Sequence, residues 1–418
     1  MNKIQEIPFK DIEKFIDIVA DAYPGLQISA AEAKKRVKER WRKRRQDKRM
    51  SWWGMYRGSE MLGGMIYYDY TMNFFGHKVL TGGAGTVAVS LVHKKEHVAR
   101  DLMRFFFRHY RKRGAPLAVL WPFRPDFYKK MGCGLGWKMD QYRLTPATLP
   151  RTKARKHVRH LGKADMKALN DCYNRFVDTR TGMIEETQVN RNIRYDLGKG
   201  VKYVGYVKDG RVLGYLIFTF ARGNPENFVD NHIKIEEMVY ESPEVLNGLL
   251  SFLHTQADQI NRIIVSSNDE YFYHCFDDPR NETGNLMSPV YHESHRSGVG
   301  IMYRVLNTRE VFNLLKDRDF DGVSVRLRLK VHDTFLKENN GDLTIHFVKG
   351  HPQIKTGRAA AEVSLGLDIA DFSSLIMGAV DLRSLYNYGR AELSKATYLE
   401  PLNQLFATKQ KPVCMTSF

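Results

Sequence analysis

Two adjacent lysines in a short polar turn are the residues of this 418-residue chain that most clearly suggest chemistry. Lys94 and Lys95 follow an apolar run containing Val87 and Val89, and an amphipathic segment begins just after them, at Val98. A helix N-terminus has unpaired N–H groups and a partial positive charge, and it therefore attracts anions. The turn predicts a site for a pyrophosphate group. The alternative is an ordinary turn between a strand and a helix, with its lysines in solvent.

The elements on both sides of this turn form a strand–turn–helix–strand unit. Alternating residues around Val87 and Val89 predict the first strand. Gly114 is the expected C-cap of the helix, and the apolar run 117–121 predicts a second, buried strand. An aromatic loop that contains Tyr128 follows. The helix itself is predicted from apolar or aromatic residues at three- and four-residue spacing: Val98, Leu102, Phe105, Phe106 and His109.

The length and composition of the chain exclude several classes of protein. A chain of 418 residues is too long for one ordinary core, and two or three domains are expected. No apolar run approaches the roughly 18–20 residues of a membrane span, so membrane insertion is not expected. The four cysteines form no CxxC pair, and the fourteen histidines show no metal-ligand spacing. We therefore expect a reduced, cytoplasmic protein without a metal site.

Half of the net charge of +18 lies in one short segment. Residues 34–49 contain eleven basic and two acidic side chains, and Val37 and Trp41 give this predicted helix one apolar edge. Such a segment can contact nucleic acid or an anionic surface. We favour a solvated helix, and nucleic acid is not an expected partner, because no nucleic-acid-binding signature accompanies the charge.

The strand–turn–helix–strand pattern occurs twice. The hairpin 207–220 resembles residues 56–68, and a strand at 234–240, an amphipathic run at 243–260 and a strand at 262–267 follow it. Glu241 and Glu244 stand where the first copy has its two lysines, and they would repel phosphate groups. The second copy is therefore predicted to lack the phosphate site, and Tyr273, which corresponds in position to Tyr128, is expected to be structural.

A third segment begins near Ile301. Residues 323–331 alternate strictly between apolar and polar, and helical patterns cover 370–378, 381–387 and 397–407, which predicts an α+β domain. The tail after Lys411 has no charged side chain and ends at Phe418, whereas free tails are usually polar. The tail is therefore expected to be buried. It either fastens the last domain or reaches a functional site.

Three such segments in this order resemble the Eis (enhanced intracellular survival) family of GNAT N-acetyltransferases. The most specific similarities lie in the strand–turn–helix 86–100, the loop 126–132, the segment 389–392 and the terminal phenylalanine. The resemblance implies a mixed α/β (α+β) fold, with two tandem GNAT-like acyl-CoA N-acyltransferase domains and a sterol-carrier-protein-like α+β domain. We expect a catalytic domain at 1–150, a second copy without a coenzyme site at 151–300, and the third domain at 301–418, its tail reaching the active site.

The resemblance also implies an activity. Members of the family transfer the acetyl group of acetyl-CoA directly to an amine in a ternary complex, without a metal. Their acceptors include aminoglycosides, and some members form hexamers, so a homo-oligomer is expected. A polyamine or a protein lysine is an alternative acceptor. A different class of function is also open: a catalytically decayed GNAT-like binding protein, whose C-terminal domain binds a lipid or a protein partner.

The family's catalytic roles, carried over to this chain, fall on Tyr128 as general acid and on the Phe418 carboxylate as general base. An amine with a pKa near 10 must lose a proton before it attacks a thioester, and the thioester oxygen needs a fixed donor, which the Val89 N–H can supply. Asp21 and Tyr23 are the expected acceptor-binding residues. His97 stands where the family has glycine. The expected coenzyme-binding residues are Val87, Val89, Lys94, Lys95, His97, Val98 and Ala99.

Overall fold

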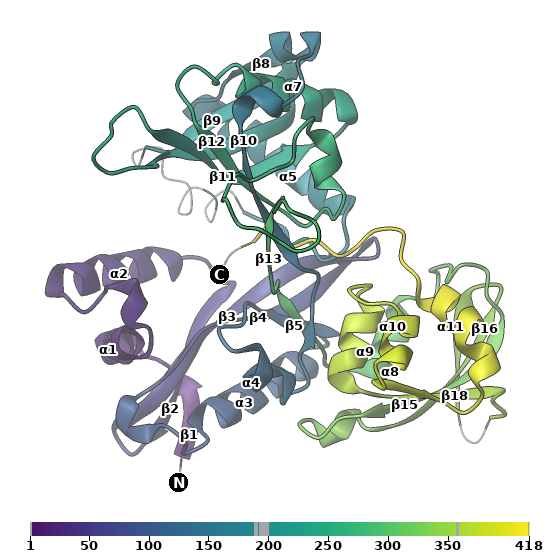
Figure 1. The fold of residues 1–418 in the computed structure, drawn as a ribbon. Coiled ribbons are helices and arrows are strands. Elements are labelled where there is room, and N and C mark those ends of the chain that lie inside the picture. Colours follow the sequence, from purple (N-terminus) through teal and green to yellow (C-terminus); the bar gives the residue numbers. More distant parts are fainter. Residues whose placement is uncertain (1, 188–190, 192–199, 357–358, 417) are drawn as a thin grey trace. The chain divides into compact units, whose positions relative to one another are not determined.

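The structure is a computed structural model that describes residues 2–187, 191, 200–356, 359–416 and 418. It consists of two compact units, shown with the chain coloured along its sequence in Figure 1. One unit contains residues 1–136 together with 300–418, and the other contains residues 137–299. The chain thus leaves the first unit at Gly136 and returns to it at Gly300, whereas the sequence suggested domain limits at 150 and 300.

A seven-stranded sheet forms the first half of the first unit, with β4 and β5 parallel and the other neighbours antiparallel. The predicted meander and the strand before the lysine turn are confirmed as β2, β3 and β4. In sheet order the strands are β1 (Asn2–Glu6), β2 (Met50–Arg57), β3 (Glu60–Phe74), β4 (His77–Val89), β5 (Leu117–Leu120), β14 (Met302–Val305) and β6 (Gly134–Leu135).

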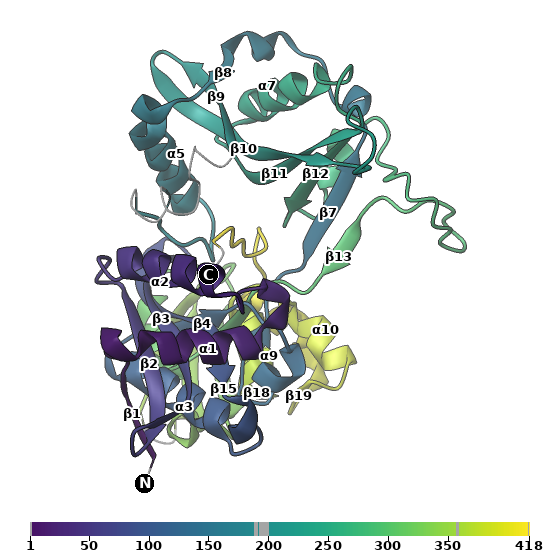
Figure 2. The same ribbon diagram turned by 90° about the vertical axis from the view of Figure 1, so that its left-hand side faces the viewer.

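Helices cover both faces of this sheet (Figure 2). Two neighbouring glycines of β3 show which helix covers each face. A Cβ on Gly63 would lie 3.0 Å from Val98 of α3, whereas a Cβ on Gly64 would lie 2.8 Å from Phe15 of α1. Because successive residues of a strand point to opposite faces, α1 and α3 lie on opposite sides. The helices of this region are α1 (Ile12–Ala22), α2 (Ala31–Arg44), α3 (Val98–Lys112) and α4 (Pro125–Lys129).

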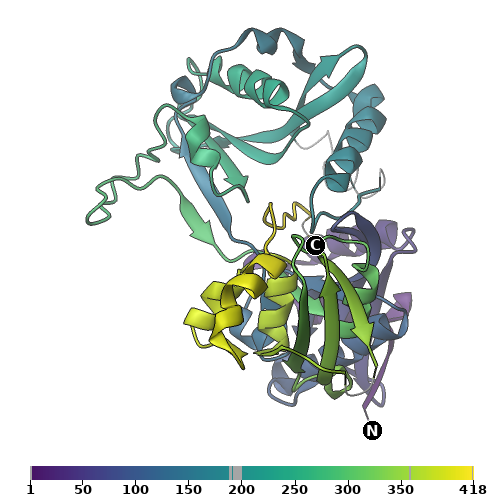
Figure 3. The ribbon, with the colours of Figure 1, turned by 90° about the vertical axis from the view of Figure 1, so that its right-hand side faces the viewer.

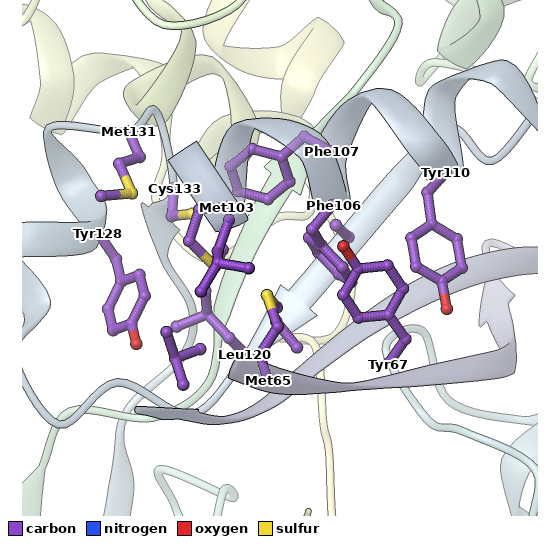
Figure 4. Close-up of a cluster of buried hydrophobic side chains, with 14 of the residues drawn as sticks. Met65, Tyr67, Met103, Phe106, Phe107, Tyr110, Leu120, Tyr128, Met131 and Cys133 are labelled. Atoms are coloured by element: carbon purple, nitrogen blue, oxygen red, sulfur yellow. The ribbon is translucent and has the colours of Figure 1, made fainter. Parts of the chain in front are cut away.

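The buried face of α3 is broader than the spacing of its apolar residues predicted. Phe105 and His109 are only partly buried, whereas Phe107 and Tyr110 are fully buried. The reason is tertiary, because the ring of Phe335 from the C-terminal segment packs edge-on against Phe107 at 6.0 Å and covers a further strip of the helix. Figure 4 shows this core, with Tyr128 at one end and Tyr110 at the other. The fully buried residues of α3 are Val98, Leu102, Met103, Phe106, Phe107 and Tyr110.

The second unit repeats the architecture of this sheet, as the sequence repeat predicted. Asp209 and Gly210 form the hairpin turn between β9 and β10, with φ of 51° and 73°, as a type I′ turn requires. Helices given with their bounds among the described residues of this unit include α5 (Met166–Asp178) and α7 (Pro243–His254). In sheet order the strands are β13 (Arg296–Gly298), β7 (Met139–Leu144), β12 (Arg262–Ser267), β11 (Asn231–Tyr240), β10 (Arg211–Arg222), β9 (Lys202–Lys208) and β8 (Val158–His160).

One strand in each sheet departs from the simple repeat. In the first sheet β14 pairs with β5, although it follows the whole second unit in the sequence. In the second sheet the matching place beside β12 belongs to β7, which comes directly after the first unit. The chain therefore completes its first sheet only after it has built the second.

The C-terminal part of the first unit is the predicted α+β domain, with its sheet in green and its last helices in yellow in Figure 3. Helix α9 packs directly on the short strand β6, where a Cβ on Gly134 would overlap the carbonyl oxygen of Ala370. In sheet order the strands are β17 (His351–Lys355), β16 (Gly341–Val348), β15 (Val325–His332), β18 (Val363–Asp368) and β19 (Ala391–Leu393). The helices are α8 (Thr308–Leu314), α9 (Ile369–Ile376), α10 (Leu382–Asn387) and α11 (Leu399–Phe406).

The described ranges lack two kinds of feature. No helix there is long and apolar enough to cross a membrane. Among the same residues, no group of three or more histidine, cysteine, aspartate or glutamate side chains is placed to hold a metal ion.

Candidate functional site

The lysine turn has a backbone that few side chains adopt. Lys95 and His97 both have left-handed φ, of 69° and 64°, and His97 is the N-cap of α3. A side chain with a Cβ is strained in this region, although histidine is found there more often than most residues. His97 therefore holds a backbone shape that glycine would adopt without strain. The first-turn N–H groups of α3 stay outside the hydrogen-bond ladder of the helix.

A cavity of about 510 Å³ opens at this helix end. Every expected coenzyme residue lines it, together with Tyr23 from the end of α1. Tyr128, Phe418 and Asp21 are described residues that do not line it. Its lining consists of Ala22, Tyr23, Val87, Val89, His93, Lys94, Lys95, His97, Val98, Ala99, Arg100, Phe123, Arg124, Phe127, Lys130, Met131 and Phe335.

The polar part of this lining is basic. Among the described residues that form the wall there is no aspartate or glutamate. An apolar cavity with cations and a helix N-terminus at its rim suits a ligand that combines phosphate groups with an apolar arm. The basic side chains are His93, Lys94, Lys95, His97, Arg100, Arg124 and Lys130.

The strand β4 presents an open edge to the cavity. Its parallel pairing with β5 ends at Ala84 and Leu120, and the strand continues to Val89. Ser90 N–H donates to Leu62 on the β3 side, so the alternation of an antiparallel ladder turns the N–H of Val89 away from β3. That N–H therefore points to the side from which β5 has diverged, where it can bind a carbonyl oxygen.

A β-bulge shapes the same edge. Thr86 and Val87 of β4 together oppose the single residue Met65 of β3, and Thr86 has a left-handed φ of 48°. The Tyr23 hydroxyl donates a 2.7 Å hydrogen bond to the Val87 carbonyl oxygen. Burial raises the pKa of Tyr23 to about 12, so this hydroxyl keeps its proton. The bulge is thus tied to the end of α1.

Tyr128 lies on α4, behind the cavity wall. Its side chain is only 3% exposed, and its ring packs edge-on against Phe123 at 5.8 Å and Phe127 at 5.2 Å. Phe123 in turn contacts the ring of Tyr23 at 6.0 Å. Burial, with a smaller effect from Tyr23, raises the pKa of Tyr128 well above its usual value. The phenol is therefore neutral at physiological pH and able to donate.

The chain end lies against the first sheet. Trp121, just after β5, donates its Nε1–H to the carbonyl oxygen of Thr416 at 2.9 Å. The half-buried ring of Phe418 packs edge-on against Tyr70 at 5.1 Å and Tyr68 at 5.5 Å. Those two tyrosines stack on each other, and a Cβ on Gly85 beneath them would lie 2.7 Å from the Tyr68 ring. The tail thus reaches the N-terminal sheet, while Ser417 lies outside the described residues.

Asp21 occupies the solvent side of α1. It is exposed. The pKa of Lys34 on α2 is raised, first by the hydrogen bond between Lys34 and Asp17 and to a smaller extent by the charge of Asp21. Tyr23 lies two residues further along, in the cavity wall. Of the two expected acceptor residues, only Tyr23 therefore faces the cavity.

His93 is a site residue that sequence reasoning missed. Its Nε2 lies 2.9 Å from Glu60 and its Nδ1 lies 3.0 Å from Glu96, which also pairs with Arg57 at 2.7 Å. The hydrogen bonds to Glu60 and then to Glu96 raise the pKa of His93 above its usual value. Its position next to Lys94 was a local signal, but Glu60 on β3 could not be placed from the sequence. Arg100 and Lys130 are also close in sequence to predicted site residues, whereas Phe335 is not, and nothing in the sequence indicated that it lines the cavity.

The second copy has closed the corresponding helix end. Helix α7 starts at Pro243, which has no N–H, and the hydroxyl of its N-cap Ser242 accepts from the Val245 N–H at 3.3 Å. The preceding Glu241 pairs with Arg175 at 2.6 Å. Tyr273 lies in a 3₁₀ turn, with its ring 4.3 Å from that of His274. The first turn of α7 therefore offers fewer free N–H groups than the first turn of α3, because Pro243 has no N–H and the Val245 N–H is already hydrogen-bonded.

Comparisons with known families agree with the three-part organisation. Residues 3–136 and residues 182–305 each match an acetyltransferase (GNAT) domain. Residues 311–415 match a sterol carrier protein domain. No curated protein matches the chain.

Several solved structures share the whole fold, each aligned over 100% of both chains. A GCN5-related N-acetyltransferase from Anabaena variabilis is 17% identical with a TM-score of 0.79. A protein from Enterococcus faecalis described as a probable N-acyltransferase is 18% identical with a TM-score of 0.79. Eis1 from Mycobacterium abscessus is 18% identical with a TM-score of 0.74. At this level of identity the likeness establishes the fold.

Proposed function

Because the chain is an Eis-like tandem GNAT acetyltransferase, we propose that it transfers the acetyl group of acetyl-CoA to an amine bound at its first domain. The observation that carries the proposal is the basic cavity, which joins the open edge of β4 to the N-terminus of α3. The second domain would bind no coenzyme, because Pro243 and Ser242 leave fewer free donors at its helix end.

The coenzyme would lie along this cavity. The α3 N-terminus, with Lys94 and Lys95, would bind the pyrophosphate group. The pantetheine arm would follow the apolar strip at Val87 and Val89, and the Val89 N–H would donate to the thioester oxygen as it gains negative charge. Such a donor is effective because it is fixed before the reaction starts.

The transfer would be direct, in a complex that holds both substrates. The acceptor ammonium first loses a proton to the Phe418 carboxylate, directly or through a water. The free amine attacks the thioester carbon, a C–N bond forms, and the C–S bond breaks as the nitrogen releases its second proton to solvent. Tyr128 would then donate its hydroxyl proton or a hydrogen bond to the leaving thiolate. Burial keeps its phenol protonated at physiological pH, which this role requires.

The test is release of free thiol from acetyl-CoA across a panel of amines that includes aminoglycosides, polyamines and lysine peptides. Turnover that depends on one amine class supports the proposal and identifies the acceptor. Tight binding of acetyl-CoA without turnover on any of these amines would instead support the alternative, a decayed binding protein.

A further inference from the structure

One wall of the basic cavity comes from the C-terminal domain. Phe335, in the loop after β15, lines the cavity alongside Arg100 of α3 and Lys130, which follows α4. It belongs to a sheet domain more than two hundred residues away in the sequence from the lysine turn. The two domains lie in the same compact unit, so their contacts are part of one body.

A row of arginines on α3 holds this loop. The Arg104 guanidinium lies 4.6 Å from the ring centroid of Phe335. One turn further on, Arg108 Nε lies 2.8 Å from Glu338 Oε1, and Arg111 donates to the Glu338 carbonyl oxygen at 3.2 Å. One turn before them, Arg100 lines the cavity. The same edge of α3 therefore contacts the C-terminal loop and, at Arg100, lines the cavity.

The loop is also fixed from within. One carboxylate oxygen of Asp333 accepts from the backbone N–H groups of Phe335 at 3.0 Å and Leu336 at 2.8 Å. Its other oxygen lies 2.6 Å from Arg304 Nη2, and neither side chain is more than 1% exposed. A buried, paired charge with further hydrogen bonds is costly to disturb. The Phe335 ring is therefore held in one position, and Phe107 supports it from below.

We propose that Phe335 contacts the adenine nucleotide half of the coenzyme, so that the C-terminal domain forms part of the coenzyme site. This inference rests on the proposed function. The thioester end is assigned to Val87 and Val89 of β4, whereas the Phe335 ring contacts Arg104 and Phe107 of α3. An aromatic edge between cations suits a purine that carries phosphate groups.

The test compares two acetyl donors. Acetyl-pantetheine lacks the adenine nucleotide but keeps the reacting thioester. Phe335→Leu keeps an apolar side chain in the wall, and we expect it to lower kcat/KM for acetyl-CoA about tenfold, within the range of a lost base–aromatic contact. We expect kcat/KM for acetyl-pantetheine to stay at the wild-type value. Phe228→Leu is the matched control, because it makes the same substitution at an exposed ring that does not line the cavity, and both donors should be unaffected.

A second variant keeps the test decisive if Phe335→Leu does not fold. In Phe335→Trp, 3′-phosphoadenosine 5′-diphosphate should quench the new indole fluorescence, and pantetheine should not. Equal losses with both donors, no loss with either, or no quenching by the nucleotide would overturn the assignment of Phe335. Absence of wild-type turnover with acetyl-CoA would instead count against the proposed function, which separates the two failures.

Discussion

His97 offers the sharpest single perturbation of the site, because its backbone and its side chain can be tested separately. Its φ of 64° and ψ of 11° place a side chain in the left-handed region, at a cost of about 1–2 kcal/mol. Glycine avoids that cost but loses about 0.5–1 kcal/mol through its freer unfolded chain. His97→Gly should therefore be about 0.5–1 kcal/mol more stable than His97→Ala, which keeps the strain and removes the imidazole.

The same pair of variants reports on coenzyme binding. Without a side chain at this position, a phosphate group can approach the backbone at the N-terminus of α3. One additional hydrogen bond to a charged group contributes about 1.5 kcal/mol, which corresponds to roughly tenfold tighter binding. We expect His97→Gly to bind acetyl-CoA about tenfold more tightly than the wild type, with His97→Ala between the two.

Calorimetry with acetyl-CoA and urea unfolding of both variants provide the measurements. Weaker binding by His97→Gly would show that the imidazole donates to the phosphates, and the reasoning about steric approach would be refuted. A glycine variant less stable than the alanine variant would contradict the assigned backbone conformation. Unfolding should be followed by two probes, because a chain with two compact units need not unfold in one step.

The remaining predictions concern catalysis, stoichiometry and pH. Tyr128→Phe should lower turnover by about 10²-fold with folding preserved, measured by thiol release, and unchanged turnover with a good amine would remove Tyr128 from the mechanism. Glycines appended after Phe418 displace its carboxylate and keep the ring, so turnover should fall much more than acetyl-CoA affinity; wild-type turnover would exclude the carboxylate as base. Calorimetry should find one acetyl-CoA bound per chain, and two equivalent sites would contradict the single-site assignment. Changing both Lys94 and Lys95 to glutamate should weaken the binding of acetyl-CoA. Because the hydrogen bonds to Glu60 and Glu96 raise the pKa of His93, their stabilising effect is complete below the usual value near 6.5 and is lost as pH rises through the raised pKa. The stability gap between the wild type and His93→Gln should therefore narrow from pH 6.5 to 9 in thermal melts, and a constant gap would argue against a charged His93.

The local elements could be predicted from the sequence because their signals are local. Strand alternation, the Asp209–Gly210 turn and the Gly114 helix end depend on neighbouring residues, and each appears where its pattern indicated. The lysine turn belongs to the same class, since a strand, a polar loop and an amphipathic helix in succession place Lys94 and Lys95 at a helix N-terminus. The internal repeat extended these local signals to a second domain.

The tertiary structure alone decided which distant residues complete the site. The entry of β14 into the first sheet, the pairing of His93 with Glu60 and the presence of Phe335 in the cavity wall join residues that no sequence period connects. The buried face of α3 was misjudged for the same reason, because Phe107 is covered by a loop from another domain. Periodicity reports how much of an element is apolar and on which side. Its partner is set by packing among all the elements at once, which becomes visible only in the folded chain.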